Sequence, residues 1–245
     1  LSHSLKYSIN MFPCLLKYVA VGIFVRLLSL SLWGVVKEEN LIARWSFDEG
    51  NGSVATDATG GGLDLLLSAN AEWGMESNAT AISKYSLSLR DGDSYARAIA
   101  HAKLEPTDSF SYLFWFKTNS QPDAFSQLLA KKDDTFSSYF VQIEPDGRSL
   151  KTIIRSFGEY YDNGSIPFSL DQWHQLAFTF DGVVFNTFLD GEWVASGEAP
   201  WSIDTNDGDL GVGGTANGSN LFKGWIDDLR FYDTTLHPRD VKESY

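Results

Sequence analysis

Phe222-Lys-Gly-Trp-Ile-Asp-Asp-Leu-Arg-Phe-Tyr-Asp233 is the stretch of sequence that decides the fold. Large side chains occupy both sets of alternating positions, which predicts a β-strand that is buried on both faces, between two layers. One face of this strand is expected to carry Trp225, Asp227, Leu229 and Phe231. Asp227 is the exception on that face, because a buried carboxylate needs hydrogen-bond donors, a cation or a proton.

Upstream of this strand, turn signals separate short alternating segments. Asp181-Gly182 and Asp190-Gly191 are hairpin signals, and they divide residues 172–196 into three strands of an antiparallel meander. Further strands are expected at 41–50, 63–67, 109–117, 127–131, 139–143, 150–154 and 210–214. Asp91-Gly92 predicts that the two halves of 86–98 form another hairpin. Helix is expected only at 238–244, where Pro238 suits a first helical turn.

Charge and cysteine content limit the possible classes of protein. The only basic residues of the first 36 positions are Lys6, Lys17 and Arg26, so 16 basic and 32 acidic residues follow and give the remainder a net charge of −16. Such a domain will not bind nucleic acid or an anionic membrane through its general field. It suits neutral hydroxyl-rich ligands, basic partners or cations. The single cysteine, Cys14, leaves the rest of the chain without a disulfide.

The N-terminal 36 residues read as a leader. Residues 18–36 are apolar except for Arg26, and Lys17 stands just before them. This pattern is similar to a secretory signal starting at Met11, and its length also allows an uncleaved membrane anchor. We therefore expect a leader at 1–36, a single domain at 37–245 and a location outside the cytosol, secreted or at the cell surface. Contact with a membrane is expected only through an uncleaved leader.

Three motifs carry a family resemblance that covers Leu41 to Tyr245. They are the opening Trp45-Ser-Phe-Asp-Glu-Gly50, the central Trp173-His-Gln-Leu-Ala-Phe-Thr-Phe-Asp-Gly182 and the closing Gly224-Trp-Ile-Asp-Asp-Leu-Arg-Phe-Tyr232. Together they resemble a LamG-like (laminin G-like) domain of the concanavalin A-like lectin/glucanase superfamily. The resemblance implies an antiparallel two-sheet jelly roll that is extracellular and binds glycans or proteins.

The same resemblance places the first and last strands near each other, where acidic turns could bind Ca²⁺. Calcium takes about six to eight oxygen ligands, and turns rich in Asp and Gly supply carboxylates and carbonyls. A structural calcium ion is expected between Asp48 and Asp227, with Asp57 and Asp93 in the neighbouring turns. The alternative is that Asp48 caps a turn and that Asp227 accepts backbone hydrogen bonds or pairs with Arg44 or Arg230.

Catalytic patterns are missing from the sequence. Retaining glucanases need two carboxylates about 5 Å apart, usually from a Glu-x-Asp-x-x-Glu strand. The nearest approach here is Glu144-Pro-Asp-Gly147, whose Pro and Gly mark a turn. His101, His174 and His237 have no Gly-x-Ser-x-Gly nucleophile motif beside them. We expect no enzymatic activity.

Glycan binding is predicted from aromatic residues beside polar turns, because sugar rings offer C–H faces for stacking and hydroxyls for hydrogen bonds. The candidate ligand-binding residues are Trp201, Tyr160, Tyr161, Asp162, Asn163 and Asn206. Phe136, Tyr139, Asp204 and Asn217 lie in similar surroundings. The alternative for each aromatic residue is that it packs inside the sandwich.

The sequence therefore predicts an exported, non-catalytic, carbohydrate-binding domain with a structural calcium ion. Two alternatives stay open. The first is an adhesion domain that binds an extracellular protein through its loops or acidic face, and the second is an accessory module of a larger polysaccharide-active enzyme. Because one fold hosts many functions, the step from fold to sugar binding is an analogy.

Overall fold

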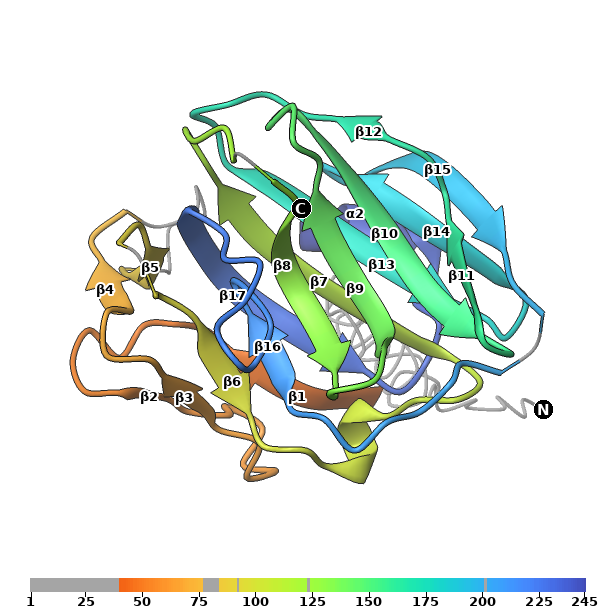
Figure 1. The fold of residues 1–245 in the computed structure, drawn as a ribbon, viewed down its shortest axis with the longest axis horizontal. Coiled ribbons are helices and arrows are strands. Elements are labelled where there is room, and N and C mark those ends of the chain that lie inside the picture. The colour runs from red at the N-terminus through yellow and green to blue at the C-terminus, as the bar shows by residue number, and fades with distance from the viewer. Residues whose placement is uncertain (1–39, 77–83, 92, 123, 201) are drawn as a thin grey trace, which may run out of the picture. The chain divides into compact units, whose positions relative to one another are not determined.

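A computed structural model of the chain describes residues 40–76, 84–91, 93–122, 124–200 and 202–245. These residues form two antiparallel β-sheets that pack face to face, together with one short α-helix (Figure 1). The predicted all-β sandwich is confirmed. The leader predicted at 1–36 lies outside the described residues, and Lys37–Tyr245 forms one compact unit.

The eight-stranded sheet has the order β15-β14-β13-β7-β17-β5-β4, and β1 also pairs with β17. The bounds of its strands are β1 Leu41–Trp45, β4 Glu72–Gly74, β5 Ser86–Leu89, β7 Phe110–Lys117, β13 His174–Phe180, β14 Val184–Leu189, β15 Glu192–Glu198 and β17 Gly224–Tyr232. The predicted meander of three strands is confirmed as β13, β14 and β15.

The nine-stranded sheet has the order β11-β10-β9-β8-β16-β6-β3-β2, and β12 also pairs with β10. The bounds of its strands are β2 Val54–Ala55, β3 Leu65–Leu67, β6 Ala96–Ala98, β8 Ser126–Lys132, β9 Ser137–Ile143, β10 Ser149–Ser156, β11 Glu159–Asp162, β12 Ile166–Pro167 and β16 Leu210–Val212. This sheet lies nearer the viewer in Figure 1.

The hairpin predicted within residues 86–98 is wrong. β5 pairs with β4 and β17 in the eight-stranded sheet, whereas β6 pairs with β3 and β16 in the nine-stranded sheet. The chain therefore crosses between the layers where a tight turn was expected. An Asp-Gly pair marks a change of direction, but the strands that follow it choose their partners by core packing.

The strand β17 lies at the centre of its sheet. It pairs with β7 along one edge, while β5 and β1 share the other edge. The expected proximity of the first and last strands is confirmed, because Trp45 is opposite Leu229 and Leu41 is opposite Tyr232.

A β-bulge corrects the predicted faces of β17. Pairing with β7 runs from Trp225 to Asp227 and resumes only at Arg230, and Asp228 has a left-handed φ of 45°. A bulge inserts one extra residue and therefore reverses the alternation beyond it. Leu229 and Phe231 join the hydrophobic core with Ile226, so Asp227 and Trp225 lie on the opposite, outer face of the sheet.

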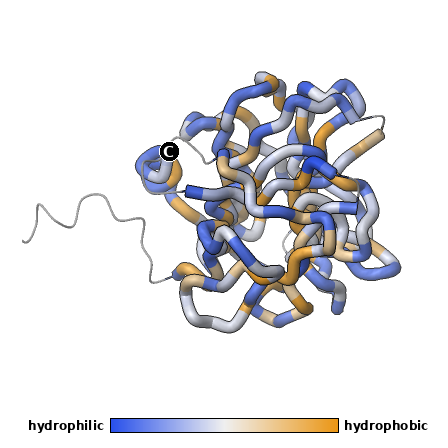
Figure 2. Tube along the Cα trace, turned by 90° about the vertical axis from the view of Figure 1, so that its left-hand side faces the viewer, coloured by the Kyte–Doolittle hydropathy of each residue, from blue (hydrophilic) through white to orange (hydrophobic). Residues whose placement is uncertain are grey.

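Aromatic rings fill the space between the sheets. The rings of Tyr112 and Phe178 stack with centroids 4.9 Å apart, and Phe110 stacks on Phe231 at 5.7 Å. Tyr139 from the facing sheet lies 5.2 Å from Phe110. Along the trace in Figure 2, apolar stretches alternate with polar ones, as expected for strands with a buried face and polar turns.

The helix predicted at residues 238–244 is confirmed. The α-helix α2 spans Pro238–Ser244, and the ring of His237 caps it by accepting a hydrogen bond from Arg239 N at 3.1 Å. A 3-10 turn at Ala102–Leu104 was not predicted. Within the described ranges, no helix has the length and apolar character needed to cross a membrane.

Candidate functional site

The candidate site lies on the outer face of the nine-stranded sheet, at the hairpin formed by β10 and β11. Ile154 and Leu150 of β10 point into the core, so Arg155 and its cross-strand partner Tyr160 point outward. Tyr160 is 51% exposed. This side chain presents an aromatic surface to solvent at the edge of the sheet.

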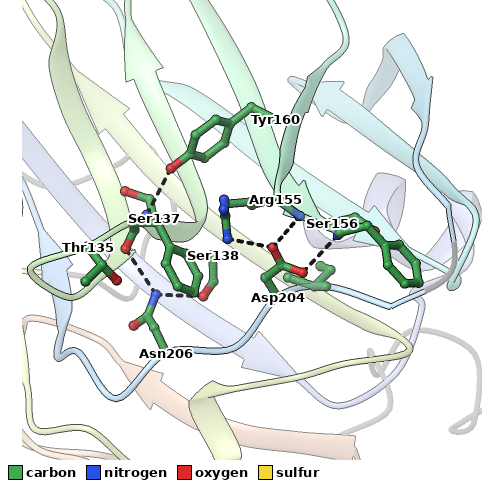
Figure 3. Close-up of polar contacts among 12 residues, drawn as sticks. Thr135, Ser137, Ser138, Arg155, Ser156, Tyr160, Asp204 and Asn206 are labelled. Atoms are coloured by element: carbon green, nitrogen blue, oxygen red, sulfur yellow. Dashed lines mark hydrogen bonds and ion pairs between the residues drawn. The ribbon is translucent and has the colours of Figure 1, made fainter.

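The Tyr160 ring is held in place at two points. Its hydroxyl oxygen accepts a hydrogen bond from Ser137 N at 3.2 Å (Figure 3). Its ring meets Phe140 edge to face with centroids 5.9 Å apart. An aromatic ring that is already fixed loses little conformational entropy when a ligand stacks on it. The ring is therefore preorganised for contact.

Arg155 lies between two rings. Its guanidinium carbon is 4.1 Å from the centroid of Phe136 and 5.7 Å from that of Tyr160. Its Nη1 forms an ion pair with Asp204 Oδ2 at 2.6 Å (Figure 3). Cation–π contacts of this kind stabilise by roughly 0.5–2 kcal/mol. The ion pair also neutralises the cation, so the site carries little net positive charge.

Asp204 fixes the turn of the same hairpin. Its Oδ1 accepts from Phe157 N and its Oδ2 from Gly158 N, both at 2.9 Å. The loop that carries Asp204 comes from the segment before β16, far from the hairpin in sequence. One carboxylate thus joins the hairpin turn, Arg155 and a distant loop.

The neighbouring predicted residues divide between the two faces of β11. Tyr161 packs against the core, whereas Asp162 lies at the surface, with Oδ2 3.6 Å from Lys151 Nζ and Oδ1 accepting from Gly164 N at 2.8 Å. Asn163 turns inward and donates to Thr187 Oγ1 at 2.6 Å. Tyr160 and Asp162 are therefore the members of this run that face solvent on the outer side.

Asn206 is a buried residue that holds its loop against β9, beside the candidate site. It is only 6% exposed, and its side-chain nitrogen donates to Ser138 Oγ at 2.7 Å and to Phe136 O at 3.3 Å (Figure 3). Tyr139 is fully buried in the core. Tyr139 therefore follows the alternative given for the aromatic residues, and the buried Asn206 holds its loop by hydrogen bonds. Trp201 lies outside the described residues.

A buried lysine anchors the loop around Asn206. The ammonium of Lys131 is 0% exposed and donates to Asn206 O at 2.7 Å, Gly208 O at 2.5 Å and Glu105 Oε1 at 3.1 Å. Carbonyl and carboxylate oxygens surround this cation much as they would surround a metal ion. It ties to the sheet the loop that carries Asp204 and Asn206.

Asp48 and Asp227 both lie near the point where the partner of β17 changes from β5 to β1. Asp48 follows β1, and its Oδ1 accepts from the backbone nitrogens of Lys84 at 2.6 Å and Tyr85 at 3.1 Å, just before β5 begins. Asp227 is 0% exposed and lies where the pairing of β17 passes from β5 to β1. Its Oδ1 accepts from the backbone nitrogen of the next residue at 2.8 Å.

The arginines considered as partners of Asp227 bind the next residue. Arg44 Nε lies 2.9 Å from Asp228 Oδ1, and Arg230 Nε lies 3.1 Å from the same oxygen. The bulge explains this choice, because the extra residue changes which carboxylate the two arginines meet.

Asp57 and Asp93, the other two residues predicted to bind calcium, differ from Asp48 and Asp227 in their surroundings. Asp57 is buried and accepts hydrogen bonds from backbone nitrogens at both carboxylate oxygens. Burial alone would raise the pKa of Asp57, but these hydrogen bonds, with that of the Thr59 hydroxyl, outweigh burial and lower the pKa. Asp93 is exposed and has a left-handed φ of 63°. Within the described ranges, no three His, Cys, Asp or Glu side chains form a group that could hold a metal ion.

The three histidines considered for catalysis have structural hydrogen bonds. His174 Nδ1 is 2.7 Å from Asp190 Oδ2, and its Nε2 is 3.0 Å from Ser169 O. Burial lowers the pKa of His174, but Asp190 and the Ser169 carbonyl outweigh burial and raise it. His101 and His237 each accept a backbone hydrogen bond at the start of a helical turn.

Sequence reasoning missed two exposed features. A cleft of about 350 Å³ opens between residues 118–122, 124–126 and 220–223, and the half-exposed Phe125 lines it together with polar and apolar side chains and Lys223. Phe157 is 72% exposed at the tip of the β10–β11 hairpin. A lone phenylalanine in a polar turn is the signal that marks both places.

Comparisons with known proteins agree with the architecture. Residues 90–242 match a family model described as the concanavalin A-like lectin/glucanases superfamily. Domain 4 of AbnA, a GH43 extracellular arabinanase from Geobacillus stearothermophilus solved in complex with arabinotriose, has a TM-score of 0.65 at 22% identity, over 83% of this chain and 97% of that chain.

Two neurotoxin domains are also similar in structure. The botulinum neurotoxin serotype G binding domain has a TM-score of 0.66 at 16% identity, over 84% of this chain and 50% of that chain. The binding domain of botulinum neurotoxin DC in complex with SialylT has a TM-score of 0.64 at 12% identity, over 85% and 51%. The chain thus spans about half of each neurotoxin domain, and at these identities the likeness concerns the fold.

Proposed function

The chain belongs to the concanavalin A-like lectin/glucanase superfamily, and from this premise we propose that it is a non-catalytic carbohydrate-binding module. The observation that carries the proposal is the half-exposed, doubly anchored ring of Tyr160 on the outer face of the nine-stranded sheet. A sugar ring can stack its C–H face on such a surface.

The polar groups beside this ring suit a neutral sugar. Asp162 and Lys151 lie on the same face and offer a carboxylate and an ammonium for hydroxyl groups. The cation of Arg155 is already neutralised by Asp204. In a domain of net charge −16, an anionic ligand would meet unfavourable electrostatics, whereas a neutral one would not.

The known proteins of similar fold support a carbohydrate as the ligand. The arabinanase domain was solved with arabinotriose and one neurotoxin domain with SialylT. The arabinanase is extracellular, which fits the proposed export of the present chain to the cell surface or beyond. The hydrophobic leader and the domain's lack of cysteine are compatible with that route.

Binding to a panel of soluble polysaccharides, measured by isothermal titration calorimetry, tests the proposal. Tyr160→Ala should weaken binding about tenfold, or ~1.4 kcal/mol. Tyr160→Phe keeps the ring and should retain most of the affinity. Trp193→Ala removes an aromatic residue that is 60% exposed on the other sheet, and it serves as the matched control. A panel without any binder, or a Tyr160→Ala protein that binds like the wild type, would refute the proposal.

We also propose a structural calcium ion near Asp48 and Asp227. Both carboxylate oxygens of Asp57 accept backbone hydrogen bonds, so Asp57 fits poorly. Glu49 offers one buried oxygen, Oε2, that has no hydrogen-bond partner among the described residues, while its Oε1 accepts from Thr56 N at 2.7 Å. Because Glu49 does not form a three-carboxylate group with Asp48 and Asp227, backbone carbonyls would have to supply further ligands. An ion there would supply the missing partner.

Thermal unfolding with calcium and with chelator tests the calcium proposal. Calcium should raise the Tm of the wild type and should raise that of Asp48→Asn less. A Tm that is the same with calcium and with chelator would count against any such ion. This outcome would leave the proposal of sugar binding unaffected, since no step at Tyr160 depends on the ion.

A further inference from the structure

The tip of the β10–β11 hairpin has a backbone that phenylalanine rarely adopts. Phe157 and Gly158 occupy the two central positions of the turn, with φ of 49° and 84°. Turns with positive φ at both central residues match the twist of the flanking strands, and they strongly favour Asn-Gly or Asp-Gly. The same chain shows the favoured solution at β14–β15, where Asp190 and Gly191 have φ of 55° and 74°.

Nothing within the described fold accounts for phenylalanine at the tip. Its side chain is 72% exposed, so it contributes little to core packing. The turn is secured through the backbone, because Asp204 binds the amides of both central residues whatever side chains they carry. A bulky residue held in a left-handed conformation that the turn does not require of it therefore points to a contact outside the domain.

The position of Phe157 relative to Tyr160 suggests the ligand. Tyr160 pairs with Arg155, so it lies about three residues from the tip, a separation of about 7–10 Å at a strand rise of about 3.3 Å per residue. That separation exceeds a single sugar ring. The acidic side chains of Glu159 and Asp162 lie on the same hairpin, and they disfavour an anionic chain.

We propose that Phe157 is a second ligand contact and that the ligand is a neutral oligosaccharide long enough to reach both Phe157 and Tyr160. This inference rests on the proposed carbohydrate binding and extends it to chain length. Two contacts on one rigid hairpin make affinity grow with the number of sugar units, because the second contact forms without additional ordering of the protein.

A ladder of neutral xylo-, arabino- and cello-oligosaccharides of one to six units, titrated by calorimetry, tests the inference. Phe157→Asn should weaken binding of the longer members about tenfold and leave the shortest bound member unchanged. The same substitution places a favoured residue in the turn, so its Tm should equal or exceed that of the wild type. Phe157→Tyr retains the ring and should bind like the wild type.

The possible failures are distinguishable. If Phe157→Asn binds the long oligosaccharides as tightly as the wild type, the inference is wrong, while a loss in Tyr160→Ala still supports the proposed function. If Phe157→Asn weakens short and long members equally, or lowers the Tm, the role of Phe157 is structural and the inference is again wrong. If no saccharide binds the wild type, both proposals fall together.

Discussion

Two stacked tyrosines in the core, Tyr112 and Tyr139, make a matched test of how buried hydroxyls affect stability. Both are fully buried, and their rings lie 6.2 Å apart. Tyr139 donates its hydroxyl to Leu104 O at 2.9 Å, whereas the Tyr112 hydroxyl has no hydrogen-bond partner among the described residues. Burial raises the pKa of both hydroxyls well above the ordinary value, so neither is ionised near neutral pH.

The two Tyr→Phe substitutions should act with opposite signs. An unpartnered buried polar group destabilises by about 1–3 kcal/mol, and the small void left by the oxygen offsets part of its removal, so Tyr112→Phe should stabilise by about 1 kcal/mol. Tyr139→Phe removes a hydrogen bond and leaves a carbonyl without its donor, and it should destabilise by about 1 kcal/mol. At roughly 2–4 °C per kcal/mol for a domain of this size, the two Tm values should differ by about 4–8 °C.

Urea unfolding followed by tryptophan fluorescence, together with calorimetry, measures both free energies of unfolding. Equal m-values would show that the substitutions leave the extent of unfolding unchanged. A Tyr112→Phe protein as destabilised as Tyr139→Phe would refute the reasoning, because it would mean that the Tyr112 hydroxyl makes a favourable contact in the folded protein.

Three further predictions concern charged groups. Asp204→Ala should increase hydrogen exchange at the two amides of the hairpin tip and weaken oligosaccharide binding, because the carboxylate fixes that turn; unchanged protection of both amides would contradict this. Lys131→Met should destabilise by about 3–5 kcal/mol in urea unfolding, since it leaves buried oxygens without their cation. The raised pKa of His174 in the folded state means that its contribution is complete below about pH 6.5 and is lost as pH rises through the folded pKa. Tm measured from pH 5 to pH 9 should therefore fall more for the wild type than for Asp190→Asn, and parallel curves would contradict the assignment.

The sequence predicted the architecture because the relevant signals are local. The meander with its Asp-Gly turns at 181–182 and 190–191 and the helix that begins at Pro238 depend on neighbouring residues, and these were predicted correctly. The bulge at Asp228 was not predicted, because apolar and polar residues alternate along 224–232 in the same way whether or not one of them bulges. Only the pairing with β7 and the backbone angle of Asp228 reveal it. The chain around Asp91 was misjudged because the partners of a strand depend on the whole core.

The candidate site was predictable only in part. Tyr160 was expected at the surface and is there, since a polar turn beside an aromatic residue is visible in sequence. The structural role of Asn206 was not predictable, because its side chain bonds to Ser138, far away in the chain. That of Asp57 was not predictable because its partners are mainly backbone nitrogens, which the sequence does not single out. Phe157 was overlooked because its left-handed backbone becomes apparent only from the dihedral angles.

The central position of β17 has a consequence for biosynthesis. Its neighbours β7, β5 and β1 are all synthesised earlier, yet each meets β17 only after the ribosome has made Gly224–Tyr232. Until then, the edges of β7, β5 and β1 that will pair with β17 have backbone groups without their partner strand, and these groups are accessible to other chains. A chaperone or slow translation that protects the growing polypeptide until β17 emerges would therefore improve the yield of native molecules.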